Sequence, residues 1–539
     1  MIPITLHAQR STRRIEAPLD LHLSRRQRLQ LVGEGALVGL AGGMTIAFYR
    51  FALSHAEELL RLATTFLRGQ GLWFLMWFVV LAILCFAVGW LVMFEPFTQG
   101  SGIPQIDAEV AGRINMPWHR VLPIKFIEGT LCALAGLSLG REGPSVQLGG
   151  MAGKGVSKAL GKNRNRERLL ITCGAASGMS AAFHAPLTGV LFAIEEIHKE
   201  FSASLVISVM TASVVADFVS SHVLGVKPLI QFGNFATIPH QLYLFVLLLG
   251  VMCGLAGAIH NRGMFFLQDR VFGPLEQRLP YVRYAVPFAL AGVMAFVLPD
   301  LMCGGDAIVE RIMHVQGESL VALVLLLVGK YLFTAICFAS GAPGGTLFPL
   351  VVMGSLFGAI YGICAMQLGD LSGAYQNSFI VLGMAGLFAS VIQAPVTAVV
   401  LVFELTGSLE ALLATTIVSI ISYVVSGLTK NEPFYEHLYD RLVGNQKKGS
   451  PDLEASQGAK SIHTYVIGPG SAVEGHEIRE IHWPEGALVV TVRHAGIESV
   501  AKGNTRLEAL DEILVVMSGS GSYEDECHIM LRRLCVAPD

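Results

Sequence analysis

The stretch Gly140-Arg141-Glu142-Gly143-Pro144 places an arginine and a carboxylate between apolar flanks. Ionisable side chains at membrane depth are costly, and they usually serve the movement of ions or protons. Pro144 suits the first turn of a helix because it has no N–H to leave unsatisfied, and the glycines let other backbone approach closely. The stretch therefore predicts a helix N-terminus, whose free N–H groups and positive dipole end favour an anion.

Glu142 can itself be that anion, or it can compete with a mobile one. The alternative is a polar loop inside the membrane in which Arg141 and Glu142 merely pair with each other. This stretch alone does not separate the two interpretations.

Composition places the chain in a membrane. Its 539 residues are 53% apolar and 15% charged, with a mean hydropathy of +0.57, and a soluble protein is less apolar. Fifty-eight glycines and the lack of strand-like alternation predict closely packed helices, hence an all-α polytopic membrane protein. Apolar segments able to cross or deeply enter a bilayer lie near 31–53, 72–94, 169–194, 203–225, 241–260, 284–303, 319–339, 347–368, 378–403 and 411–428.

Charge and cysteine usage add expectations about location and partners. Residues 1–30 are rich in arginine and show no cleavable signal, so we expect this basic segment to stay in the cytoplasm. Seven of the nine cysteines lie in or beside apolar segments without CxxC spacing, which is typical of packing residues. No disulfide, metal or cofactor is expected, and the net charge of −3 does not indicate a nucleic-acid partner.

Two pairs of motifs repeat along the chain. Ala185-Pro186-Leu187-Thr188 is followed by Glu195, and Ala394-Pro395-Val396-Thr397 by Glu404, each glutamate nine residues after the proline. Gly140…Pro144…Gly149 returns as Gly345…Pro349…Gly354. These echoes predict homologous halves, about 30–225 and 235–440, with a transport site at their interface. We expect inverted repeats, although hydropathy alone does not fix the orientation and Ala-Pro-x-Thr can recur by chance.

Three glycine-rich interruptions each end in proline: 100–104 (GSGIP), 140–144 (GREGP) and 341–349 (GAPGGTLFP). Each can begin a helix, so three sets of N–H donors could converge on one mobile anion. Cation channels instead line their filters with carbonyls or carboxylate rings, and no TVGYG-like run is present.

In this order the three motifs resemble those of the CLC family of chloride channels and chloride/proton antiporters, bacterial type, over residues 31–439. The resemblance implies a homodimer in the bacterial inner membrane, surrounded by lipid. It also implies cytoplasmic termini, one pathway per subunit, and chloride and protons as the transported species.

The resemblance also implies a set of anion-binding residues. Ser101 would supply a hydroxyl, Thr346 and Leu347 their N–H groups, and Tyr435 its phenol, with Arg141 and Gly143 from the second motif completing the set. Ser101 favours chloride, since nitrate-preferring relatives typically carry proline there. Leu347 stands where the family usually has phenylalanine, and Phe348 follows. The N–H donors should survive this departure, whereas its effect on the shape of the pathway is not fixed by the sequence. Tyr435 could instead be an aromatic residue of the membrane interface.

Two glutamates receive roles from the resemblance: Glu142 as external gate and Glu196 as internal proton-transfer residue, a position uncharged in most channel members. Glu195 matches Glu404 across the repeat, whereas Glu196 matches Leu405, so we expect Glu195 to be structural. The alternative for Glu196 is a solvated helix end. Lys125 and Glu128 are three residues apart and are expected to pair with each other.

After Tyr439 the composition changes. We expect a polar linker at 440–460 and, over 461–539, a small α/β cytoplasmic domain with strands at His463–Ile467, Ala487–Arg493, Ile497–Val500 and Ile513–Met517 and a helix from Tyr523 to Leu534. The run Val466 to Met517 resembles the TrkA-C type, the C-terminal subdomain of regulators of potassium conductance. It could be a dimerisation tail or a sensor for a small intracellular ligand.

The leading hypothesis is a proton-coupled chloride antiporter. The alternative is a passive chloride channel gated by voltage or a ligand, followed by a cation transporter with a ligand-sensing tail. The weakest hypothesis is an intramembrane hydrolase. An enzyme is not expected, since no His-Glu-x-x-His metal pair occurs.

Overall fold

A computed structural model describes residues 25–68, 70–199, 201–225, 236–279, 281–314, 319–407, 411–449, 460–494 and 497–518, with Cys527, Met530, Leu531, Arg532, Leu534 and Cys535. The chain divides into two compact units, residues 1–443 and 444–539. Residues 1–24, which make up most of the basic segment expected at the N-terminus, lie outside the described residues. The helix α1 begins at Arg25.

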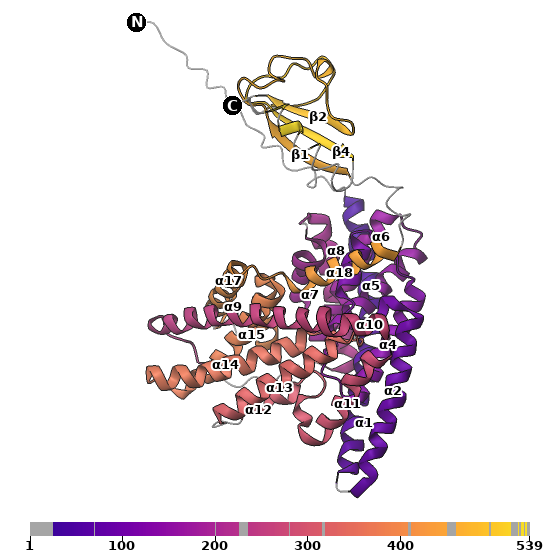
Figure 1. The fold of residues 1–539 in the computed structure, drawn as a ribbon, viewed down its shortest axis with the longest axis vertical. Helices are drawn as coiled ribbons and strands as arrows, with labels where there is room; N and C mark the ends of the chain where they lie inside the picture. The colour runs from indigo at the N-terminus through magenta and orange to yellow at the C-terminus, as the bar shows by residue number, and fades with distance from the viewer. Residues whose placement is uncertain are drawn as a thin grey trace. The chain divides into compact units, whose positions relative to one another are not determined.

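The first unit is helical throughout its described part, as predicted (Figure 1). The first half contains α1 (Arg25–Leu67), α2 (Phe74–Phe94), α3 (Ile103–Val110), α4 (Trp118–Ala135), α5 (Glu142–Ala159), α6 (Arg164–Phe183), α7 (Pro186–Phe192) and α8 (Ala203–Leu224). The second contains α9 (Tyr243–Phe266), α10 (Gly273–Arg278), α11 (Val282–Val297), α12 (Asp306–His314), α13 (Leu320–Ala339), α14 (Leu347–Gly369), α15 (Gln376–Ile392), α16 (Pro395–Thr406), α17 (Leu412–Leu428) and α18 (Phe434–Gly449). Within the described ranges, seven helices are long and apolar enough to cross a membrane.

Two of the predicted apolar segments each contain two α-helices. In 169–194, α6 ends at Phe183 and α7 begins at Pro186, with His184 between them at a φ of 56°. In 378–403, α15 ends at Ile392 and α16 begins at Pro395, with Gln393 at a φ of 67°. The physical reason is the same in both places, because proline cannot continue a helix and the left-handed residue turns the chain. Hydropathy alone does not register such a break.

Small residues bring the helices of each half together. A Cβ on Gly149 of α5 would collide with the backbone of α6 at Gly174 and Gly178. A Cβ on Gly354 of α14 would meet the α15 backbone at Gly383 in the same way. Such close contacts between helix backbones provide much of the packing energy between membrane helices, and they occur at matching places in the two halves.

Two glutamates join the halves in opposite directions. Glu404, near the end of α16, accepts hydrogen bonds from the N–H groups of Leu187 (2.8 Å) and Thr188 (2.7 Å) at the start of α7. Glu195, just after α7, accepts in turn from Thr397 N (2.8 Å) at the start of α16. Each carboxylate therefore caps the helix of the other half. This reciprocity requires α7 and α16 to run antiparallel, which is the arrangement of inverted repeats.

Two buried lysines repeat as well, and one of them corrects an expectation. Lys125 of α4 donates to the carbonyls of Thr98 (2.7 Å) and Gly100 (2.6 Å). Lys330 of α13 donates likewise to Leu301 (3.0 Å) and Cys303 (2.9 Å). The expected pair of Lys125 with Glu128 is wrong, because the ammonium group satisfies carbonyls that would otherwise be buried without a donor. Both Glu128 carboxylate oxygens are buried and have no hydrogen-bond partner among the described residues.

The second unit contains a four-stranded antiparallel sheet in the order β1-β4-β2-β3. The strands are β1 (Lys460–Val466), β2 (Ala487–His494), β3 (Ile497–Val500) and β4 (Glu512–Ser518), close to the four predicted runs. Much of the expected helix at Tyr523–Leu534 lies outside the described residues, although Cys527, Leu531 and Cys535 are buried in the core of this unit. The predicted linker 440–460 begins as helix, since α18 continues to Gly449; residues 450–459 are not described.

Candidate functional site

Backbone hydrogen bonds bring the three glycine-rich motifs to one place. Gly100 N donates to Gly341 O (3.1 Å), and Gly344 N donates to Gly100 O (3.0 Å). Gly140 and Gly345 exchange both of their hydrogen bonds, at 2.7 and 2.8 Å. The helices that follow, α3, α5 and α14, therefore begin beside one another, as the sequence analysis expected.

Gly143 lies where this junction is tightest. A Cβ at this position would collide with both the hydroxyl and the carbonyl of Ser101 and would press on the Cα of Gly345. Only the absence of a side chain lets the start of α5 contact the other two motifs at once. The structure thus gives Gly143 a packing role within the candidate site.

Two hydroxyls at the junction lack partners. Ser101 and Tyr435 are 3% and 1% exposed, and neither hydroxyl has a hydrogen-bond partner among the described residues. The Tyr435 phenol, from the first turn of α18, lies near Ser101 and Thr346. Buried hydroxyls are nearly always hydrogen-bonded. A pair left open beside converging helix N-termini fits an anion, which accepts from both.

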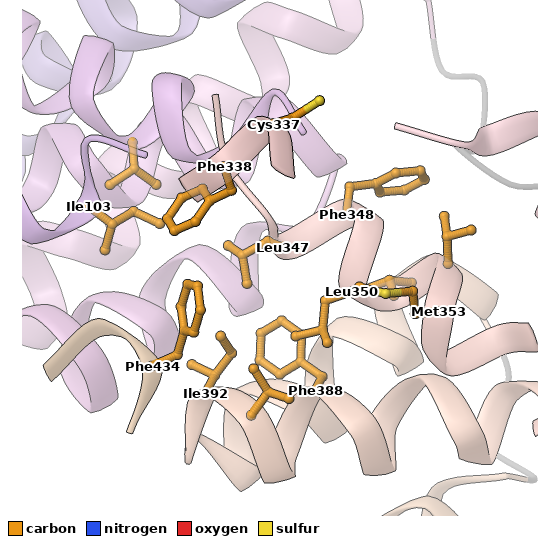
Figure 2. Packing of buried hydrophobic residues seen from close by; sticks show 14 of the residues in the cluster. Ile103, Cys337, Phe338, Leu347, Phe348, Leu350, Met353, Phe388, Ile392 and Phe434 are labelled. Carbon is orange, nitrogen blue, oxygen red and sulfur yellow. The ribbon is translucent and has the colours of Figure 1, made fainter. Parts of the chain in front are cut away.

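The start of α14 separates two sides of the site. Thr346 is its N-cap and Leu347 its first residue, both buried. Figure 2 shows the Leu347 side chain directed towards Phe338 and Phe434, whose rings are 5.5 Å apart. Phe348 points elsewhere, packs against Phe183 at 6.2 Å and lines a separate cavity. The departure from the usual family pattern therefore moves the aromatic ring to the Glu142 side of the site.

Glu142 reaches from one half to the other. It is the first residue of α5, it is fully buried, and its Oε2 accepts a hydrogen bond from Phe348 N at the start of α14 (3.4 Å). Its carboxylate thus occupies the N-terminal end of a helix, where an anion is favoured. The sequence analysis did not single out Phe348 N as a donor. The signal for it was the motif itself, since the second residue of a helix always has a free N–H.

Arg141 does not form the close pair with Glu142 that the alternative interpretation requires. Its Nε lies 3.9 Å from Glu142 Oε1, beyond hydrogen-bonding distance, and its buried Nη2 has no partner within the described part of the chain. The side chain is 21% exposed and lines the same cavity as Phe348 and Glu142. It therefore faces the approach to the site and not its centre.

Glu196 lies in a π-helical turn, Ala193–His198, directly after α7. It is 7% exposed, which differs from a solvated helix end. Asp107 of α3, Lys199 and Glu436 of α18 surround it, and both Glu196 and Glu142 lie within electrostatic range of the Tyr435 phenol. The wide turn gives two successive glutamates different surroundings: Glu195 caps α16, whereas Glu196 lies within electrostatic range of Asp107 on α3 and Glu436 on α18.

One stretch, 136–140 (GLSLG), has the Gly-x-Ser-x-Gly spacing of a hydrolase nucleophile elbow. Its Ser138 is fully buried, and its hydroxyl pairs with the Thr334 hydroxyl at 2.8 Å. A hydroxyl held in this way is not an exposed nucleophile, so the stretch gives no support to an enzyme.

Inverted helical halves with an anion-favouring junction of helix N-termini at their interface define a membrane transport protein. The family model described as "Voltage gated chloride channel" matches residues 84–427, more than half of the chain. The chain belongs to the CLC family of chloride channels and transporters, and it is therefore a multi-pass membrane protein and not an enzyme.

Two curated relatives in this family are named as H+/Cl− exchange transporters. The chain is 32% identical over 427 residues to the H(+)/Cl(-) exchange transporter ClcA of Vibrio cholerae serotype O1 (strain M66-2), covering 77% of this chain and 90% of that protein. It is 31% identical over 432 residues to the ClcA of Vibrio parahaemolyticus serotype O3:K6, covering 78% and 92%.

Solved structures agree on the fold. A slow cyanobacterial Cl−/H+ antiporter aligns with a TM-score of 0.72 at 27% identity, covering 78% of this chain and 99% of that one. A eukaryotic CLC transporter aligns with a TM-score of 0.64 at 22% identity, covering 77% and 74%, and shows the fold alone. The tail matches the TrkA-C domain model over residues 462–524, so the resemblance seen in its sequence is confirmed.

Proposed function

We propose that this protein exchanges chloride for protons across the membrane, with Glu142 as the group that couples the two. The observation that carries the proposal is the hydrogen bond from Phe348 N to Glu142 Oε2, which joins the carboxylate to a helix N-terminus of the opposite half. A carboxylate in that place occupies donors that chloride would use. The ClcA relatives, which are named as H+/Cl− exchangers, support the same activity.

Competition for those donors gives a coupling mechanism. Charged Glu142 and chloride exclude each other at the start of α14, because both are anions drawn to the same N–H groups. Protonation removes the charge of Glu142 and with it most of its attraction to the helix end. A proton arriving at Glu142 and a chloride entering the site therefore favour the same displaced state of the side chain.

The hydroxyls of Ser101 and Tyr435 supply the central chloride site, together with the N–H groups of Thr346 and Leu347. Both hydroxyls lack another acceptor among the described residues, so donating to chloride satisfies them without breaking an existing bond. Arg141 is placed at the approach to this site, where its positive charge offsets part of the negative charge of the carboxylates that line the same cavity.

Glu196 receives protons on the opposite side of the site from Glu142. His198, two residues later, lies 3.5 Å from Thr172 in the first half of α6. Glu34, near the start of α1, contacts Arg166 at the start of the same helix (2.7 Å). These contacts place Glu196 near the end of the membrane unit where α1 begins. Glu57 lies on the same helix, about 35 Å beyond Glu34 at the usual rise of a helix, and it lines the cavity beside Glu142. The two proton-transfer residues thus serve opposite faces of the membrane.

A passive channel is the competing function, and one experiment separates the two. Purified protein in liposomes is given a chloride gradient with no proton gradient. We expect protons to move uphill, against the resulting proton gradient, in step with chloride. Chloride movement that never drives protons would make this protein a channel, and chloride-independent cation flux would favour the cation transporter.

Three further parts of the proposal concern assembly and location. The protein is a homodimer in the bacterial inner membrane, as the resemblance to the CLC family implies, with one complete pathway per chain, since one chain supplies all three glycine-rich helix starts. Both termini are cytoplasmic. The TrkA-C tail regulates transport through a small intracellular ligand and takes no part in the pathway. A folded truncation after Gly449 that changes chloride selectivity would contradict this role.

A further inference from the structure

The cavity in front of Glu142 carries two carboxylates that the transport mechanism does not use. Glu57 of α1 and Asp306, the first residue of α12, line it together with Arg141 and Glu142. Neither Glu57 nor Asp306 has a hydrogen-bond or ion-pair partner among the residues that the structure describes. Both are half-buried. The approach to a pathway for anions therefore contains more negative than positive side chains.

That charge balance is unfavourable for chloride and favourable for protons. Carboxylates in a narrow cavity with low-dielectric walls raise the local concentration of cations, including protons, and repel anions. Glu142 lines the same cavity, and its buried Oε1 has no hydrogen-bond partner within the described chain. A proton held on either carboxylate thus has an unpartnered acceptor oxygen on a residue that lines the same cavity.

The fold does not require an acid at the Asp306 position. Gly305, at a φ of 97°, precedes α12, and Gly102, also at 97°, precedes α3 in the first half. Lys330 and Lys125 hold the carbonyls just before these two glycines. At the matching first helical position the first half has Ile103, which is buried. The scaffold accepts an apolar residue there, so the Asp306 carboxylate is a feature of the cavity.

We propose that Glu57 and Asp306 collect protons at the outer mouth and deliver them to Glu142. This inference rests on the proposed exchange function and adds the entry residues of its proton branch. In each transfer, the O–H bond of a protonated Glu57 or Asp306 breaks, an O–H bond forms on Glu142, and the donor regains its negative charge. Other charged or titratable groups near this space are Arg61 and Tyr49 on α1, Cys132 on α4, Arg141, Lys330 on α13, and Cys303. The positive charges of the arginines and the lysine offset the repulsion between two ionised carboxylates. Both Glu57 and Asp306 can therefore regain their negative charge after the transfer.

The test uses full-length protein in liposomes and the double variant Glu57→Gln/Asp306→Asn. Asparagine keeps the size and an acceptor oxygen of the Asp306 side chain and removes its charge. We expect proton-coupled exchange at alkaline pH on the Glu142 side to fall about ten-fold, because proton collection becomes limiting. At acidic pH on that side, the rate should approach that of the wild type. The number of chlorides per proton should stay unchanged.

Glu58→Gln is the matched control. Glu58 is the next residue on α1, it is exposed, and it does not line the cavity. It should keep the wild-type pH profile while losing one negative charge, as each of the single variants does. The single variants Glu57→Gln and Asp306→Asn report on the proposal if the double variant does not fold, and each should shift the profile in the same direction.

Three results would overturn the inference. One is a double variant with the wild-type pH profile. Another is faster chloride flux by the same factor at every pH, which would make the carboxylates a barrier to chloride and not a relay. The last is the same shift in Glu58→Gln, which would indicate a general surface-charge effect. These results differ from a failure of the proposed function, in which the wild-type protein itself moves no protons.

Discussion

The two halves of the membrane unit share a scaffold and differ where charge is needed. Lys125 and Lys330 hold equivalent carbonyls, and Glu195 and Glu404 cap each other's neighbouring helices. At the first residue of the long helix that begins at the site, however, α5 has Glu142 and α14 has Leu347. At the position after each capping glutamate, the first half has Glu196 and the second half has Leu405. The repeated residues build the structure, and the unrepeated carboxylates are where we place the transport chemistry.

The largest expected effect comes from making position 142 uncharged. Glu142→Gln keeps the helix start and imitates the protonated side chain permanently, so chloride flux should persist while coupled proton flux falls to the leak of empty liposomes. Leu347→Met, at the equivalent position of the second half, keeps its N–H donor and should remain coupled. Parallel chloride-electrode and pH-electrode recordings measure both. Uphill proton movement by Glu142→Gln would remove this residue from the coupling step.

Glu196→Gln should also stop proton flux, but with slower chloride movement, because charged Glu142 still competes for the start of α14. Its neighbour is the control. Glu195→Gln weakens a charged helix cap, which costs about 1 kcal/mol of stability, and should leave coupling intact. Thermal unfolding in detergent and liposome flux separate the two results. Equal loss of coupling in both variants would mean that the turn as a whole, not Glu196, carries the effect.

The buried lysines should be alike in stability and unlike in function. Lys125→Met and Lys330→Met each leave two buried carbonyls without their donor, at a cost of about 2–5 kcal/mol. Only Lys125 holds the carbonyl of Gly100, directly before Ser101, so only its loss should also weaken chloride binding. Calorimetric titration with chloride and thermal unfolding test this. Similar chloride affinity in the two variants would contradict a specific role of Lys125 in shaping the site.

Ser101 has no hydroxyl counterpart, because Gly304 stands at the matching place before Gly305. Ser101→Gly, which makes the first half resemble the second, should weaken chloride binding about ten-fold through the loss of one hydrogen bond to a charged acceptor. Tyr435→Phe should do the same while keeping the ring that packs against Phe192. Calorimetry measures both affinities. If neither variant binds chloride more weakly, these hydroxyls are not part of the central site.

The smallest effect is expected in the tail, outside both halves. His494 Nδ1 lies 2.6 Å from Asp511 Oδ1, and this pairing raises the pKa of the imidazole above its ordinary value of 6.5. The contribution of the pair to stability is fully present below pH 6.5 and is lost as the pH rises through the higher pKa of the folded state. Amide protection factors in β2 and β4, which are corrected for the intrinsic pH dependence of exchange, should therefore fall at alkaline pH in the wild type. His494→Gln should show a smaller change, and an identical pH response would exclude this pair as its cause.

Much of the fold was predictable because its signals are local. Helical apolar segments, the two echoes and four short strands follow from composition, spacing and turn residues that neighbours in the chain supply. Local signals did not predict where an apolar segment breaks into two helices or which groups a buried charged side chain contacts. Neither the turns at His184 and Gln393 nor the carbonyl partners of Lys125 can be read from hydropathy. The repetition of the two lysines could have been predicted from the sequence, because Lys125 precedes Gly140 by as many residues as Lys330 precedes Gly345.

The sequence by itself determined that the chain is a two-half helical membrane protein with three glycine-rich helix starts and a small separate tail. It also identified Glu142 as a candidate, because a carboxylate among apolar segments is rare, and it identified Ser101, Glu196 and Tyr435 through the resemblance to the CLC family. Only the tertiary structure decided that Glu142 reaches Phe348 N, that Glu195 is a cap, and that Glu57 and Asp306 share a cavity with Glu142. Such contacts join residues far apart in the chain, and their geometry depends on how the inverted halves pack, which no local pattern records.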